Sequence, residues 1–244
     1  MTIPHTDCSA CIEMLFTDRG DYPQRIRAAH QAGFAAVEFW LWTPKDLPAI
    51  KAALADTGLR VAGFVAEPTQ PLNDPANHAA FLKALPGAIA AAQSLGAPFL
   101  YTQGGSQRPG VPRDQQTADL TAVLARAADL LHGSGVTLLL EPVSDAQNGF
   151  LAHAAQGLPI VASVNRPELR LLYDLYHAAV AGEDLRTTVG PDTALIGHVH
   201  VADHPGRGAP GSGTLTLDAD LNWLRAQGYK GLFGLEYLPH LHIG

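Results

Sequence analysis

Charged residues are scarce in this 244-residue sequence, at 16% of the total, and those present are more often acidic than basic. There are 23 Asp and Glu against 16 Lys and Arg, which gives a formal net charge of −7. A nucleic-acid-binding surface usually shows as a clustered excess of Lys and Arg, so this balance argues against a nucleic-acid partner. Apolar residues make up 47% of the chain, which is enough for a large core and argues against disorder.

The sequence also has no run of about 18 consecutive apolar residues, the length that a membrane-spanning helix needs. Residues 1–7 contain neither the basic nor the apolar region of a secretory signal. We therefore expect a cytoplasmic protein with no membrane partner.

Cysteine is nearly absent, since Cys8 and Cys11 are the two in the chain. A C-x-x-C pair can be redox-active or form half of a zinc site. Here a second cysteine pair is missing, and no helix start follows that would lower a thiol pKa. We interpret both as small residues of a first strand.

What the sequence does have is a regular alternation of short β-branched or aromatic runs with longer segments rich in Ala, Leu, Arg and Gln. Eight strands are expected, at residues 8–16, 35–40, 59–66, 98–103, 136–141, 169–174, 196–202 and 231–237. Helices are expected between them, at residues 22–31, 44–56, 75–94, 113–132, 149–163, an irregular 178–189, and 218–226. No linker or shift in composition divides the chain, so we expect one domain over residues 1–244.

Eight β/α units can form either a closed barrel or an open, doubly wound sheet. An open dinucleotide-binding sheet would carry G-x-G-x-x-G after its first strand, where residues 16–21 read FTDRGD. The number of units favours a (β/α)8 TIM barrel. Because the chain ends soon after the eighth strand, we expect its final helix to be short or absent.

In a TIM barrel the chemistry lies at the C-terminal ends of the strands. Four consecutive strands carry polar residues there: Glu141, Asp174, the pair His198 and His200, and Glu236. Three carboxylates and an imidazole in one barrel mouth would repel one another without a cation. We predict one divalent metal ion at this point, and oxygen-rich ligands with a single histidine suit Mn²⁺, Mg²⁺ or Co²⁺, with Zn²⁺ as a further candidate.

Each of these residues also has a structural explanation. Glu141 can form a salt bridge at the rim, and Asp174 can cap the next helix. His198 lies deeper in its strand and is interpreted as a hydrogen-bonded core residue, whereas His200 is assigned as the ligand. Glu236 is hardest to explain otherwise, because an acid between Leu235 and Tyr237 has little access to solvent.

Several segments of the sequence resemble the hydroxypyruvate isomerases of the xylose isomerase-like TIM-barrel superfamily. In the second half these segments are residues 174–177 (DLYH), 197–203 (GHVHVAD), 206–207 with 210–213, and 234–237 (GLEY). In the first half they are residues 14–17, 32–34 and 37–40. The resemblance covers nearly the whole chain.

The resemblance implies roles for six residues. Glu141, Asp174, His200 and Glu236 would bind one divalent metal ion, Glu141 and Glu236 would also act as the acid/base pair, and His177 and Arg207 would contact the substrate. Two positions differ from the family pattern: hydroxypyruvate isomerases typically have Gln where His200 stands, and Thr214 replaces a usual Glu. The related ketose 3-epimerases have His at the position of His200.

This residue set predicts an isomerase of carbohydrate metabolism that acts on a small hydroxycarbonyl compound through a metal-stabilised enediolate. Hydroxypyruvate, which would become tartronate semialdehyde, is the leading substrate, because Arg207 could pair with its carboxylate through two hydrogen bonds. The alternatives are a ketose 3-epimerase of the tagatose or psicose type, an apurinic endonuclease-like enzyme and a non-catalytic barrel. The native metal, the exact substrate and homo-oligomer formation stay open.

Overall fold

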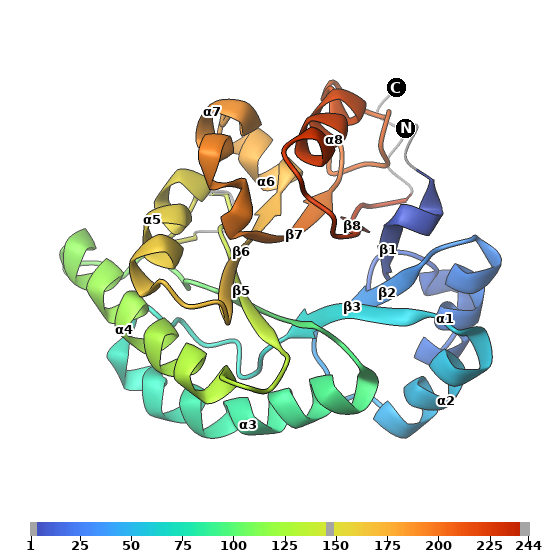
Figure 1. Ribbon diagram of the computed structural model, residues 1–244, viewed down its shortest axis with the longest axis horizontal. Helices are drawn as coiled ribbons and strands as arrows, with labels where there is room; N and C mark the ends of the chain where they lie inside the picture. The colour runs from blue at the N-terminus through green and yellow to red at the C-terminus, as the bar shows by residue number, and fades with distance from the viewer. Residues whose placement is uncertain (1–3, 145–148, 240–244) are drawn as a thin grey trace.

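The strands of the chain form a closed parallel barrel in the order β1 to β8 (Figure 1), seen here in a computed structural model that describes residues 4–144 and 149–239. Their bounds are β1 Cys8–Cys11, β2 Ala36–Phe39, β3 Arg60–Val65, β4 Phe99–Gln103, β5 Thr137–Glu141, β6 Leu169–Asp174, β7 Ile196–Val201 and β8 Phe233–Leu235. β1 pairs with β8 as well as with β2, which closes the barrel. The predicted (β/α)8 TIM barrel is confirmed.

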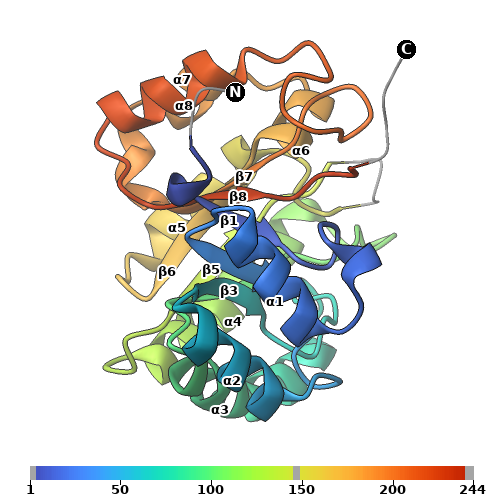
Figure 2. The same ribbon diagram turned by 90° about the vertical axis from the view of Figure 1, so that its right-hand side faces the viewer.

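The helices surround the barrel, as the two ribbon views show (Figures 1 and 2). Their bounds are α1 Tyr22–Gln31, α2 Leu47–Thr57, α3 His78–Leu95, α4 Arg113–Leu131, α5 Ala154–Val164, α6 Leu175–Val180, α7 Leu185–Val189 and α8 Leu217–Ala226. Short 3-10 helices lie at His5–Asp7, Thr17–Arg19, Pro75–Asn77 and Gly190–Leu195. Residues 236–239, which follow β8, form no helix, and the remaining positions of the expected short or absent final helix, 240–244, lie outside the described residues.

Local sequence signals explain where several helices begin and end. Asp21 accepts the backbone N–H of Gln24, whose side chain in turn accepts the N–H of Asp21, so α1 opens with a capping box. Asp46 caps α2 in a similar way. The same helix ends on Gly58, which has a φ of 74° that a side chain would disfavour.

Several expected elements were placed wrongly at their ends. β8 covers only the middle of the expected residues 231–237, and the expected irregular helix at 178–189 is two helices, α6 and α7, of which α6 directly follows β6. The first strand stops at Cys11 instead of residue 16, because Met14 and Leu15 both donate backbone hydrogen bonds to the Cys11 carbonyl in a turn. α5 begins at Ala154 instead of residue 149. The residues before it run alongside other segments, since Phe150 donates to the carbonyl of Gly105 and Val143 donates to that of Leu151.

The inside of the barrel is layered, because side chains alternate along each strand. A small apolar cluster of Tyr101, Leu139 and Leu172 lies inside it, apart from the main core. The last residues of β4, β5 and β6 lie two residues further along each strand, and they are Gln103, Glu141 and Asp174. The apolar layer therefore forms the floor of a polar mouth.

Cys8 and Cys11 form the two ends of β1, and both are buried free thiols, which confirms their placement in a first strand. In the part of the chain that the structure describes, no helix is long and apolar enough to cross a membrane.

Candidate metal centre

The barrel mouth brings together the four residues predicted as metal ligands. Glu141 ends β5, Asp174 ends β6, His200 lies in β7, and Glu236 directly follows β8. Each offers one ligand atom, and these atoms all lie within 4.8 Å of one another. The four residues are between 4% and 9% exposed, so their charges are shielded from water and act strongly on one another.

The side chain of His200 tests whether the mouth suits a cation. Both of its ring nitrogens are buried, and among the described residues neither has a hydrogen-bond partner. Nδ1 lies 3.3 Å from Glu236 Oε2 and 3.6 Å from Glu141 Oε1. A buried nitrogen left without a hydrogen bond between two carboxylates is the arrangement expected where all three side chains share an ion. The residues present therefore fit a divalent metal.

Asp174 combines the two roles considered for it. Its Oδ1 accepts the backbone N–H groups of Tyr176 at 2.7 Å and His177 at 3.1 Å, and so caps α6. Its Oδ2 lies 3.6 Å from Arg207 Nη2 and 3.9 Å from His177 Nε2. Capping thus holds one oxygen in place and leaves the other facing the mouth.

The electrostatics of the mouth favour the ionised forms of Glu141 and Glu236. Burial alone raises the pKa of a carboxyl group, but the positive charges of His200 and Arg207 outweigh it and lower the pKa of Glu236 to about 2. Burial and His200 act on Glu141 in the same opposing directions, and its pKa is also lowered. The pKa of His200 is raised well above its ordinary value, because Glu236 and Glu38 outweigh the effect of burial.

His177 and Arg207, the predicted substrate contacts, lie beside this cluster. The backbone N–H of Ser144 points at His177 Nδ1 from 3.3 Å, so Nδ1 is the acceptor of the ring and Nε2 carries the proton toward the mouth. The guanidinium of Arg207 forms an ion pair with Glu236 through Nη2 and stacks 5.4 Å from the centre of the Tyr176 ring. Both side chains stand where a bound small molecule would meet them.

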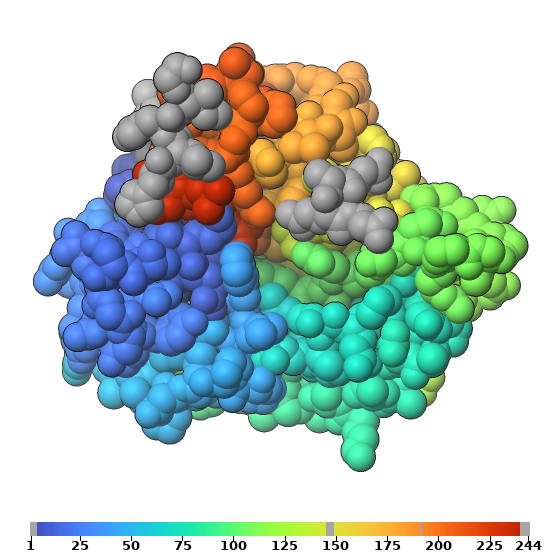
Figure 3. All heavy atoms as spheres, turned by 180° about the vertical axis from the view of Figure 1, so that it is seen from behind, coloured from blue at the N-terminus to red at the C-terminus, as the bar shows by residue number. Residues whose placement is uncertain are grey.

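A cavity of about 540 Å³ opens over the cluster. Its walls include Glu141, His177, His200, Arg207 and Glu236 together with residues that follow β2, β3 and β4. Figure 3 shows the face opposite to that of Figure 1, with a central hollow between the N-terminal (blue), middle (green) and C-terminal (orange) parts of the chain. The volume falls within the range of about 300–1,000 Å³ that is common for small-molecule sites.

Several side chains contact the cluster in ways that the sequence did not predict, although Trp40 is a candidate wall of the pocket from its place in the sequence. Trp40 donates its Nε1–H to Glu236 Oε1 at 2.7 Å, and Gln103 donates to Glu141 Oε2 at 3.0 Å. Glu38, in the middle of β2, lies 3.4 Å from His200 Nε2. A signal existed for Glu38, since an acid between Val37 and Phe39 in an apolar strand resembles the pattern that pointed to Glu236.

Comparison with known proteins finds matches along nearly the whole chain. Residues 26–241 match the family described as "Xylose isomerase-like TIM barrel". The hydroxypyruvate isomerase of Escherichia coli (strain K12) is 29% identical over 95% of this chain and 93% of its own length. A human relative, whose name assigns it to the hydroxypyruvate isomerases, is 33% identical over 95% of this chain and 89% of its own length. The crystal structure of an AP endonuclease, family 2, from Brucella melitensis is 26% identical, with a TM-score of 0.89 over 96% of this chain and 93% of that chain.

Proposed function

This chain belongs to the xylose isomerase-like TIM barrel family, and we propose that it converts hydroxypyruvate into tartronate semialdehyde. Its curated relatives show that it is an isomerase of the hydroxypyruvate isomerase group. The observation that carries the proposal is the buried His200 Nδ1, left between the carboxylates of Glu141 and Glu236 at the base of a cavity. We propose one divalent ion there, Mn²⁺, Mg²⁺ or Co²⁺, with Zn²⁺ as a further candidate. The proposed setting is the cytoplasm, with a free small molecule as the partner.

The reaction moves one hydrogen between adjacent carbons. When bound, the metal supplies a positive charge that stabilises the negative oxygen formed as a proton leaves carbon. We assign Glu141 and Glu236 as the two proton carriers, because they face one another across His200. One takes the proton from the carbon that bears the hydroxyl group, and the other delivers a proton to the carbonyl carbon, while the hydroxyl proton passes to the former carbonyl oxygen.

The remaining cavity residues orient the substrate. The guanidinium of Arg207 offers paired N–H donors that match a carboxylate, which favours a keto acid over a neutral sugar. The Nε2–H of His177 faces the same space and can donate to a substrate oxygen. We therefore propose that both residues bind substrate, with Arg207 selecting its acidic end.

The test is product formation by purified protein that has been stripped of metal and then reloaded. With Mn²⁺ or Mg²⁺ added, the protein should convert hydroxypyruvate into tartronate semialdehyde, and the stripped protein should not. Glu236→Gln, which keeps the shape of the side chain and removes its basicity, serves as the inactive control. A metal-loaded wild-type protein that leaves hydroxypyruvate unchanged would overturn the assignment.

A second candidate is a ketose 3-epimerase. His200 favours it, because the ketose 3-epimerases that this sequence resembles have histidine at that position. The same two glutamates would then remove and return a proton on opposite faces of one carbon. Incubation with fructose, tagatose or psicose distinguishes the two reactions, because an epimerase inverts carbon 3 and forms no aldehyde.

An endonuclease activity is the less favoured alternative. Such enzymes of this superfamily use a cluster of three metals with extra histidines on earlier strands. Among the described residues, two histidines line the cavity, His177 and His200, and both lie in the second half of the chain. Nicking of an abasic DNA duplex by the metal-loaded protein would revive that assignment.

A further inference from the structure

Glu38 is a buried charge that the proposed reaction does not use. It projects from β2 into the barrel and is 2% exposed. Its Oε2 accepts the hydroxyl of Tyr101 at 2.7 Å and faces His198 Nε2 at 3.0 Å, and its Oε1 accepts the hydroxyl of Ser9 at 3.3 Å. Three groups that can donate therefore converge on this carboxylate, which favours the ionised form and holds it in place.

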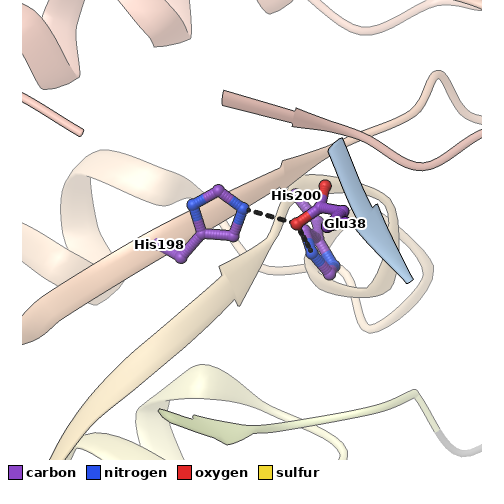
Figure 4. Close-up of side chains that lie close together, drawn as sticks. All are labelled: Glu38, His198 and His200. Atoms are coloured by element: carbon purple, nitrogen blue, oxygen red, sulfur yellow. Dashed lines mark hydrogen bonds and ion pairs between the residues drawn. The ribbon is translucent and has the colours of Figure 1, made fainter. Parts of the chain in front are cut away.

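The fourth neighbour of Glu38 is His200. Figure 4 shows the carboxylate of Glu38 between the two histidine rings, with one dashed line to each. Glu38 Oε2 lies 3.4 Å from His200 Nε2, whereas Nδ1 on the other side of that ring faces Glu141 and Glu236. The imidazole thus stands between a buried carboxylate on one side and the proposed metal on the other.

This placement decides which ring nitrogen of His200 is available as a ligand. A histidine that coordinates a metal is neutral and carries a single N–H. Nδ1 faces Glu141 and Glu236, where the ion would take its lone pair, so the single proton belongs on Nε2, and the ionised Glu38, which only accepts hydrogen bonds, favours it there. Nδ1 is left with its lone pair directed into the mouth.

Glu38, His198 and His200 also satisfy the geometric requirement for a second metal group, since their ligand atoms lie within 4.8 Å of one another. The packing argues for a hydrogen-bonded network instead. Both oxygens of Glu38 already accept hydroxyl groups. The space is also tight, because a Cβ added at Gly234 would lie 2.3 Å from Glu38 Oε1 and 2.7 Å from His198 Nε2.

We propose that Glu38 is a positioning residue of the metal centre: it holds His200 with its proton on Nε2 and so presents Nδ1 to the ion. The arrangement is a carboxylate–imidazole–metal relay in which Tyr101 and His198 fix Oε2, the oxygen of Glu38 that faces His200. This inference rests on the metal site of the proposed function, and it concerns affinity for the ion instead of a step of the reaction.

The first test compares Mn²⁺ affinity, by calorimetric titration, between the wild type and Glu38→Gln. An amide of the same shape no longer restricts His200 to one tautomer, and loss of such an outer partner weakens metal binding by about 10- to 100-fold. Ser9→Ala is the matched control, because it removes a contact to Oε1, the oxygen that does not face His200, and its loss of affinity should be far smaller. Thermal unfolding of the metal-free variants reports separately on folding.

The second test does not use Glu38→Gln, so it stands even if that variant fails to fold. Nitrogen NMR of the Zn²⁺-loaded protein, with His200 assigned by comparison with His200→Gln, should show Nε2 protonated and Nδ1 bound to the metal. The opposite tautomer, or equal Mn²⁺ affinity of wild type and Glu38→Gln, would overturn the inference. A second bound ion per chain that is lost in Glu38→Gln would also overturn the inference, because it would show that Glu38 is itself a metal ligand. A wild type that binds no metal at all would instead defeat the proposed function.

Discussion

At the scale of single residues, several contacts converge on Glu236. Trp40 Nε1 donates to its Oε1, Cys11 Sγ lies 3.7 Å from the same oxygen, and Arg207 pairs with Oε2. These contacts come from β1 and from the segments after β2 and β7, so they hold the carboxylate from three directions. The position of the proposed base is therefore set by residues remote from it in sequence.

Trp40→Phe should lower the turnover of hydroxypyruvate by about tenfold or more, because a hydrogen bond to a charged group contributes about 1.5–3 kcal/mol. Steady-state kinetics of the metal-loaded protein measure this loss. Trp42→Phe is the matched control, since among the described residues Trp42 Nε1 has no hydrogen-bond partner. Equal losses in the two variants would mean that the contact to Glu236 has no part in the reaction.

Arg207→Ala should raise KM for hydroxypyruvate by about 10- to 100-fold, because a charge-assisted contact to the substrate carboxylate is lost. Arg207→Lys should recover only part of the affinity, since an ammonium group lacks the paired donors of a guanidinium. Initial-rate kinetics over a range of hydroxypyruvate concentrations give both values. An unchanged KM in Arg207→Ala would show that Arg207 does not bind the carboxylate.

The four proposed ligands could be named from sequence because each stands at or near the end of an apolar strand, where the active sites of TIM barrels lie. The hydrogen bonds of Trp40 and Gln103 could not be proposed, because each joins two different strand ends: Gln103 is the register partner of Glu141 on the adjacent strand, and Trp40 reaches Glu236 past β1. Such contacts depend on the register of neighbouring strands and on how far each side chain reaches. Neither quantity is encoded in the periodicity of a single segment.

At the scale of elements, strand and helix order followed from the alternation of apolar runs, while some boundaries did not. β1 and β8 are shorter than the apolar segments that contain them, because apolar residues continue beyond the residues that pair with neighbouring strands. α5 starts late because residues 149–152 are held by backbone contacts to segments elsewhere in the mouth. Long-range backbone pairing thus overrides the local pattern at these points.

Gly234 in β8 shows how close the strand approaches the network beneath the mouth. Gly234→Ala should destabilise the protein by about 1–3 kcal/mol, the usual cost of overpacking, because the new methyl group would meet Glu38 and His198. Chemical denaturation measures the change. Gly87→Ala is the control: its nearest neighbour is Trp42 at 3.9 Å, and alanine in a helix is favoured over glycine by about 0.8–1.0 kcal/mol. A Gly234→Ala variant as stable as the wild type would mean that the network has room to spare.

At the scale of the whole molecule, the proposed metal joins the ends of four strands that come from widely separated parts of the sequence, residues 141 to 236. The unfolded chain has no such arrangement, so the ion should bind the folded state alone. A metal present at 100 times its Kd then adds about 2.7 kcal/mol to the free energy of unfolding.

For a chain of this length, that stabilisation should raise the Tm by about 5–10 °C. Differential scanning calorimetry with and without Mn²⁺ measures the shift, and a chelator should reverse it. The double variant Glu141→Gln, Glu236→Gln should show little or no shift. A shift of the same size in that variant would place the stabilising ion elsewhere on the molecule.

The most direct test of the whole account is hydrogen exchange between substrate and solvent. Hydroxypyruvate is incubated in D₂O with Mg²⁺-loaded protein, and the deuterium at its hydroxyl-bearing carbon is followed by NMR against a protein-free control. We expect rapid incorporation that requires the metal and falls by at least about 100-fold in Glu236→Gln. Wild-type protein with one bound metal per chain that exchanges no hydrogen with hydroxypyruvate, or with fructose, tagatose or psicose, would contradict the account.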